Sequence, residues 1–183
     1  VGCKPCSITT GFAGAGAFSD GKLSLSPDVG GNLPEILGYD RTIELLKESD
    51  DIYLKFGADE KVYGIDEEEE IASIRKKAIQ ANLKLIECPI RHLGTEEGYK
   101  IYSRLQEHLL NEGVDMIFDT MVKDIIIEDG VAKGVVTDKG ETYTADEIVA
   151  AVGREGSEWL SGICRKYDIE TQVGTVDVGV RVE

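Results

Sequence analysis

The glycines of this 183-residue chain are unevenly placed, and their placement constrains the fold more than any other feature. Eight of the 21 glycines fall within the first 38 residues. Because glycine is unfavourable inside helices and strands and marks turns, we expect that segment to consist mostly of loop and turn. The densest stretch runs from Gly11 to Lys22, where small side chains leave the backbone uncovered. Its N–H groups can approach a ligand closely and form an anion-binding concavity.

The glycine-rich stretch departs from two known phosphate-binding motifs. Gly14 and Gly16 begin a GxGxxG pattern, but Ser19 stands at the position of the third glycine. We therefore do not interpret it as a primary dinucleotide loop. Gly21-Lys22 is followed by Leu23 rather than Ser or Thr, so a P-loop is excluded as well. We still predict ligand contact here, with the charge of Lys22 offsetting that of a phosphate or a reduced flavin.

Hydrophobic periodicity and capping residues divide the rest of the chain into helices and strands. Helices are expected over 32–38, 40–56, 66–81, 95–113 and 157–167. Strands are expected over 83–88, 114–118, 122–128, 131–137, 141–144 and 148–152, and near 169 and 176–182. Asp129-Gly130 predicts a tight hairpin turn, and the apolar run 148–152 predicts a strand buried on both faces. The fold class predicted from this pattern is mixed α/β, with a β-meander and a helical insert.

The charge balance excludes some partners. Thirty-five acidic residues stand against twenty basic ones, which gives a net charge of −15. Phosphate binding by nucleic-acid-binding proteins needs clustered Lys and Arg, so we expect no nucleic-acid partner, and anionic membrane surfaces are disfavoured for the same reason. No stretch approaches the roughly 18 to 20 apolar residues of a membrane helix, so we expect a soluble, cytoplasmic protein.

The four cysteines leave their role open. Cys3 and Cys6 form a CxxC unit, which is either half of a zinc or iron–sulfur site, a redox pair, or a pair without such a role. A metal half-site needs a second pair, and Cys88 and Cys164 are isolated in the sequence. The irregular spacing favours reduced thiols over disulfides. It also favours a CxxC unit without a metal or redox role.

His92 is the candidate catalytic side chain. It lies just before the helix that Thr95 is expected to begin, where a helix N-terminus favours an anion or a neutral imidazole. A loop histidine satisfied by the backbone is an equally good interpretation. The second histidine, His108, falls on the surface of the same helix, and Ser157 lacks the GxSxG context of a hydrolase nucleophile.

Taken together, these stretches resemble flavoprotein oxidoreductases of the glutathione-reductase-like superfamily, and more closely the FAD-dependent dehydrogenases labelled NAD(FAD)-utilising dehydrogenases. Residues 14–23 resemble that family's G-A-G-x-F-S-D-G-K-L loop. Residues 89–95 are similar to its P-x-H-[IL]-G-T step, with extra residues between the proline and the histidine. Residues 120–125, the 130–140 meander and residues 150–153 resemble the superfamily's second FAD-edge region.

The resemblance implies a Rossmann-like FAD-binding domain portion with FAD as cofactor, NAD(P)H as electron donor and a small-molecule substrate. Val122 would meet the adenine through its backbone, and His92 would lie near the isoalloxazine. The ADP portion would lie along Ala151, Val152 and Gly153. The pyrophosphate and flavin would be approached by Gly14, Gly16, Ser19, Asp20, Gly21 and Lys22.

The family's N-terminal GxGxxG unit is missing from these residues, so we interpret the chain as an internal fragment of an FAD-dependent oxidoreductase. On its own we expect it to be inactive and to bind FAD weakly or not at all. The expected parts are a flavin-facing loop segment (1–31), a helical insert (32–92), an FAD-domain portion (93–173) and the start of a substrate or cap domain (174–183). The alternative is a non-catalytic acidic α/β module whose 66–81 helix binds a basic protein partner.

Overall fold

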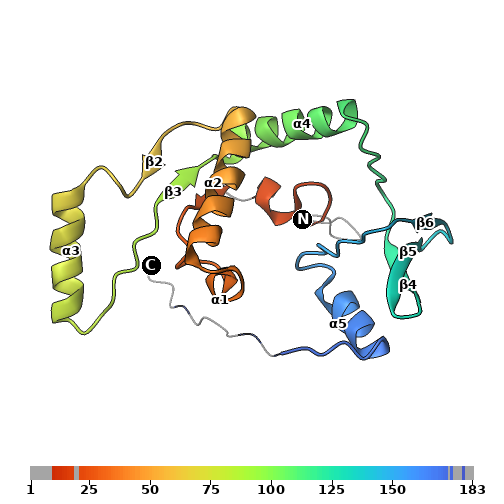
Figure 1. The fold of residues 1–183 in the computed structure, drawn as a ribbon. Coiled ribbons are helices and arrows are strands. Elements are labelled where there is room, and N and C mark those ends of the chain that lie inside the picture. The colour runs from red at the N-terminus through yellow and green to blue at the C-terminus, as the bar shows by residue number, and fades with distance from the viewer. Residues whose placement is uncertain (1–9, 19–20, 173, 175–178, 180–183) are drawn as a thin grey trace. The chain divides into compact units, whose positions relative to one another are not determined.

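The computed structural model of the protein describes every residue except 1–9, 19–20, 173, 175–178 and 180–183. The chain divides into two units, residues 1–116 and 117–183. Each unit contains a three-stranded antiparallel sheet, accompanied by several helices in the first unit and by α5 in the second (Figure 1). This combination confirms the mixed α/β class predicted from the sequence.

The sheet of the first unit joins segments that are far apart in the sequence. Its strand order is β1-β3-β2, with β1 at Lys22–Ser24, β3 at Ile90–His92 and β2 at Val62–Tyr63. Figure 1 shows α3 between the segment that follows β2 and the segment that leads to β3. The other elements of this unit are η1 (Gly14–Phe18), α1 (Leu33–Leu37), α2 (Tyr39–Lys55), α3 (Glu68–Gln80) and α4 (Thr95–Asn111).

A small apolar core lies where α2, β3 and α4 meet. Ile101 on α4 is its most buried side chain, with 1% of its surface exposed. The core consists of Ala58, Leu93 and Ile101, with Leu23, Tyr53 and Phe56 packed against it. Leu23 belongs to β1 and Leu93 directly follows β3, so burying this cluster fixes the strand pair next to α4.

The second unit is a meander followed by a helix. Its strands are β4 (Val122–Glu128), β5 (Val131–Thr137) and β6 (Thr142–Thr144), in the order β4-β5-β6, and α5 spans Ser157–Lys166. Asp129 and Gly130 have φ angles of +51° and +77°. Positive φ at both central residues is the geometry of a type I′ turn, so the predicted Asp-Gly hairpin is confirmed.

Local signals predicted the longer helices well. The acidic side chains Glu68, Glu69 and Glu70 occupy the first turn of α3 and Lys77 occupies the last, as the helix dipole favours. Gly113 follows α4 with φ at +84°, the left-handed conformation expected of a C-terminal cap.

Four predicted strands are wrong. Residues 83–88, 114–118, 148–152 and those near 169 have irregular backbone. A strand exists only where a neighbouring strand accepts its backbone hydrogen bonds, and no described strand pairs with these segments. The expected double burial at 148–152 is wrong for the same reason, since the Val149 side chain is 87% exposed.

The three short strands of the first sheet were missed from the sequence. Strands of two or three residues carry too little alternation to be recognised, and they form here because their partners supply the hydrogen bonds. The strand predicted over 176–182 lies outside the described residues, apart from Gly179.

Candidate functional site

The glycine-rich loop forms a short 3-10 helix, η1, before it enters β1. The backbone N–H of Gly14 donates to the carbonyl of Gly11 at 3.0 Å, which closes the turn that starts η1. Gly14 and Gly21 have φ angles of +52° and +61°, where glycine avoids the steric cost of a side chain. Ser19 and Asp20, both predicted cofactor residues, lie outside the described residues.

The pairing of β1 with β3 brings the end of this loop to His92. Lys22 stands opposite His92 in the antiparallel register, and both residues are exposed. The N–H of Leu93 donates to the carbonyl of Gly21 at 2.9 Å, one position further along. Gly21, Lys22 and His92, predicted separately, therefore meet at one end of the β1–β3 strand pair.

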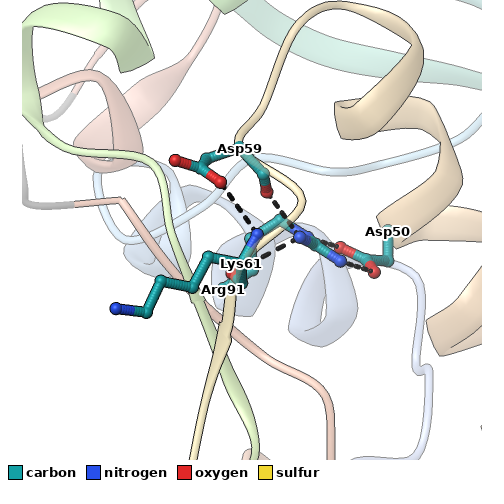
Figure 2. Close-up of polar contacts among 4 residues, drawn as sticks. All are labelled: Asp50, Asp59, Lys61 and Arg91. Carbon is teal, nitrogen blue, oxygen red and sulfur yellow. Dashed lines mark hydrogen bonds and ion pairs between the residues drawn. The ribbon is translucent and has the colours of Figure 1, made fainter.

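Arg91, the residue before His92, is held by a buried ion pair that the sequence did not reveal. Its side chain is 4% exposed, and the guanidinium donates from Nε and Nη2 to the two carboxylate oxygens of Asp50, at 2.5 and 2.7 Å. Nη1 also donates to the carbonyl oxygens of Asp59 and Lys61 (Figure 2). The hydrogen bonds to Asp50 raise the pKa of Arg91 further above its usual value. This bidentate pair fixes β3 to α2 and the loop after it, and so fixes the backbone that carries His92.

Tyr102 on α4 lies against η1. A Cβ built on Gly16 would stand 3.0 Å from the Tyr102 hydroxyl oxygen, so the absent side chain makes room for this tyrosine. The hydroxyl of Tyr102 is 3.5 Å from that of Tyr53 on α2, and the two rings meet edge to face at 85°. Burial raises the pKa of Tyr102, which keeps its hydroxyl protonated.

The predicted adenine and ADP residues all belong to the second unit. Val122 begins β4 and pairs with Thr137 of β5. Ala151, Val152 and Gly153 lie in an irregular segment before α5 instead of at the end of a strand. Gly153 has φ at +60°, and a Cβ built on it would meet no atom within 4 Å, so its backbone is open to approach.

Side chains of α5 and of Tyr167, the residue after it, connect this helix to β4. The indole N–H of Trp159 donates to the backbone carbonyl of Lys123 at 2.9 Å. The hydroxyl of Tyr167 donates to the backbone carbonyl of Ile125 at 2.8 Å. Lys166 forms an ion pair with Asp124. The hydrogen bond from Lys166 lowers the pKa of the Asp124 carboxyl below its usual value.

We expect this ion pair to give the second unit an acid-sensitive contact. The pKa of Asp124 is lower in the folded than in the unfolded state, so the ion pair contributes fully to the free energy of unfolding above the unfolded pKa of about 3.9. That contribution is lost as the pH falls through the folded pKa. Asp124→Asn should be less stable than wild type at neutral pH, and the difference should vanish in acid. Urea unfolding followed by the fluorescence of Trp159, the single tryptophan, measures this. Asp146→Asn, at an exposed position, is the control. A difference in the free energy of unfolding between wild type and Asp124→Asn that stays constant at all pH values would contradict the prediction.

The cysteine unit cannot be placed in this site, since Cys3 and Cys6 lie outside the described residues. Cys88 and Cys164 are free thiols. Within the described part of the chain, no three His, Cys, Asp or Glu side chains are grouped so that they could hold a metal ion.

Two further observations concern a hollow in the first unit and the length of the helices. A hollow of about 680 Å³ lies between α3 and residues 25–28, and none of the predicted cofactor residues lines it. In the portion of the chain that the structure describes, no helix is long and apolar enough to cross a membrane.

Comparison with known proteins supports the flavoprotein interpretation at the level of the superfamily. Residues 69–179, more than half of the chain, match the family model described as pyridine nucleotide-disulphide oxidoreductase. The match covers β3 with His92, α4 and the meander of the second unit. No curated protein sequence matches the chain.

Proposed function

Because the chain belongs to the pyridine nucleotide-disulphide oxidoreductase family, we propose that it carries the flavin and ADP contacts of an FAD-dependent dehydrogenase. The observation that supports this most is the pairing of β1 with β3. It sets the glycine-rich loop beside His92, although 70 positions separate Lys22 from His92 in the sequence. A glycine-rich loop with an exposed lysine, next to an exposed imidazole, suits an anionic cofactor with a redox-active ring.

The residues present fit such a cofactor in their chemistry. Gly11 and Gly153 both have positive φ, and a Cβ built on either would meet nothing within 4 Å. Uncovered backbone of this kind lets a ribose or a pyrophosphate come close to peptide groups. The chain has a net charge of −15, which repels an anionic cofactor. The positive charge of Lys22 at the end of the loop opposes this repulsion.

Each predicted residue then has a role. Gly14, Gly16, Ser19, Asp20 and Gly21 approach the pyrophosphate and flavin, and Lys22 supplies positive charge. His92 faces the isoalloxazine, where it can hold or move a proton at an imidazole nitrogen. Val122 meets the adenine through its backbone, and Ala151, Val152 and Gly153 line the ADP. Bound FAD would supply hydride chemistry, with NAD(P)H as the electron donor.

The proposal is tested by two matched glycine substitutions in the second unit. Gly153→Ala should weaken FAD binding by the full-length protein about ten-fold, or about 1.4 kcal/mol, because the new methyl group occupies the approach to the ADP. Gly140→Ala is the control. Gly140 also has positive φ, at +80°, and also has nothing within 4 Å of a built Cβ, so the folding cost is matched. Quenching of FAD fluorescence on titration gives both dissociation constants.

Three outcomes are distinguishable. A selective loss at Gly153 supports the proposal. Equal losses in the two variants would mean that the substitutions act through folding, which would contradict the assigned role of Gly153. A full-length protein that purifies colourless and binds no added FAD would overturn the proposed function as a whole.

A further inference from the structure

The glycine-rich loop is held at two points by the segment that contains α4. At its far end, Gly21 accepts a hydrogen bond from the N–H of Leu93, and a Cβ built on Gly21 would lie 2.9 Å from the Leu93 Cβ. Leu93 is 5% exposed and stands two residues before α4 begins. At its near end, η1 lies against Tyr102 on the third turn of α4. Tyr102 of α4 and Leu93 just before it therefore contact the loop at two separate positions, Gly16 and Gly21.

The contact at Gly16 depends on glycine for reasons of space and not of backbone conformation. The φ angle of Gly16 lies outside the left-handed region, so an alanine is compatible with the backbone there. What opposes a side chain is Tyr102, with Oη at 3.0 Å and Cζ at 3.8 Å from a built Cβ. Removing only the hydroxyl group would leave an ordinary van der Waals distance.

Tyr102 is itself fixed from the other side. The ring of Tyr53 on α2 meets it edge to face with centroids 6.0 Å apart, and the two hydroxyl groups are 3.5 Å apart. Tyr53 packs against the core of Ala58, Leu93 and Ile101. Edge-to-face pairs of this kind contribute beyond their buried area, so the tyrosine pair forms a stiff support.

We propose that Tyr102, supported by Tyr53, is a positioning residue that sets the glycine-rich loop for cofactor binding. The proposal rests on the proposed function, because it assigns the loop to FAD. It gives Gly16 a further role: its missing side chain lets the Tyr102 hydroxyl approach the loop closely.

A double-mutant cycle on the full-length protein tests the contact. Tyr102→Phe should weaken FAD binding about two- to ten-fold, because it removes the hydroxyl group that lies beside Gly16 and is 3.5 Å from that of Tyr53. Gly16→Ala should weaken it about ten-fold in the wild-type background, but less than about two-fold in the Tyr102→Phe background, where the methyl group has room. Tyr99→Phe, on the same helix but 70% exposed, should leave FAD binding unchanged.

A second measurement works without the cofactor. Amide hydrogen exchange of residues 11–18 should be faster in Tyr102→Phe than in wild type, since the loop loses one of its two supports. Tyr99→Phe should not change it. A general loss of stability would instead raise exchange throughout the first unit, including α2.

The outcomes separate this inference from the proposed function. If wild type binds FAD and Gly16→Ala costs the same in both backgrounds, the positioning role is wrong while the proposed function stands. If wild type binds no FAD, the proposed function fails and the cofactor role of Tyr102 fails with it. Unchanged exchange of residues 11–18 in Tyr102→Phe would overturn the support of the loop by Tyr102 in either case.

Discussion

Asp50→Ala should lower the free energy of unfolding of the first unit by about 3 kcal/mol. The substitution leaves the Arg91 side chain, which is only 4% exposed, without the carboxylate that accepts two of its hydrogen bonds. A buried charge deprived of its partner cannot recover its hydration, and this penalty exceeds the net value of the pair itself. The carbonyl oxygens of Asp59 and Lys61 remain as acceptors for the guanidinium. The loss of free energy therefore stays at the lower end of the range for broken buried ion pairs. Urea unfolding followed by circular dichroism measures it.

Two further variants separate the buried pair from a general sensitivity of α2. Asp51→Ala changes the exposed neighbour and should cost about 0.5 kcal/mol or less. The double variant Asp50→Leu/Arg91→Met removes both charges and should be more stable than Asp50→Ala alone. Equal effects of Asp50→Ala and Asp51→Ala would show that the ion pair does not stabilise the unit.

Gly21→Ala should destabilise the first unit by about 3 kcal/mol, from two separate causes. The residue has φ at +61°, which is unfavourable for any side chain, and its Cβ would stand 2.9 Å from the Cβ of buried Leu93. Because Leu93 belongs to the core, it cannot move away freely. The clash would also strain the register in which Lys22 faces His92.

Gly94→Ala isolates the first cause, so that the second can be obtained by difference. Gly94 has φ at +73°, but a Cβ built on it would meet nothing within 4 Å, so its substitution carries only the conformational cost of about 1 to 2 kcal/mol. Thermal unfolding of the two variants side by side gives the difference that is due to packing. Equal destabilisation would mean that the contact between Gly21 and Leu93 does not constrain the loop.

The parts of the fold that local chemistry specifies were predictable. The dipole-matched charges of α3, the left-handed Gly113 and the Asp129-Gly130 turn all act within a few residues, so their effect can be read along the sequence. The predicted strand over 148–152 was wrong because an apolar run does not show whether a partner strand exists. Strand pairing is decided by segments elsewhere in the chain.

The candidate site shows the same limit. The glycines, Lys22 and His92 were recognised by composition and by resemblance, whereas Arg91 and Tyr102 were missed. Arg91 pairs with Asp50 across 41 positions and Tyr102 meets Tyr53 across 49. Such pairs leave no periodic pattern along the sequence, so only a folded structure reveals the groups that hold the site residues in place.

The pairing of β1 with β3 also sets an order of events when the chain is made. At synthesis rates of about 5 to 20 residues per second, β1 leaves the ribosome several seconds before β3 is complete. Until then Leu23 has neither its partner strand nor the core of Ala58, Leu93 and Ile101 to cover it. The pairing that sets Lys22 opposite His92 therefore cannot form until the whole segment between the two strands has been made.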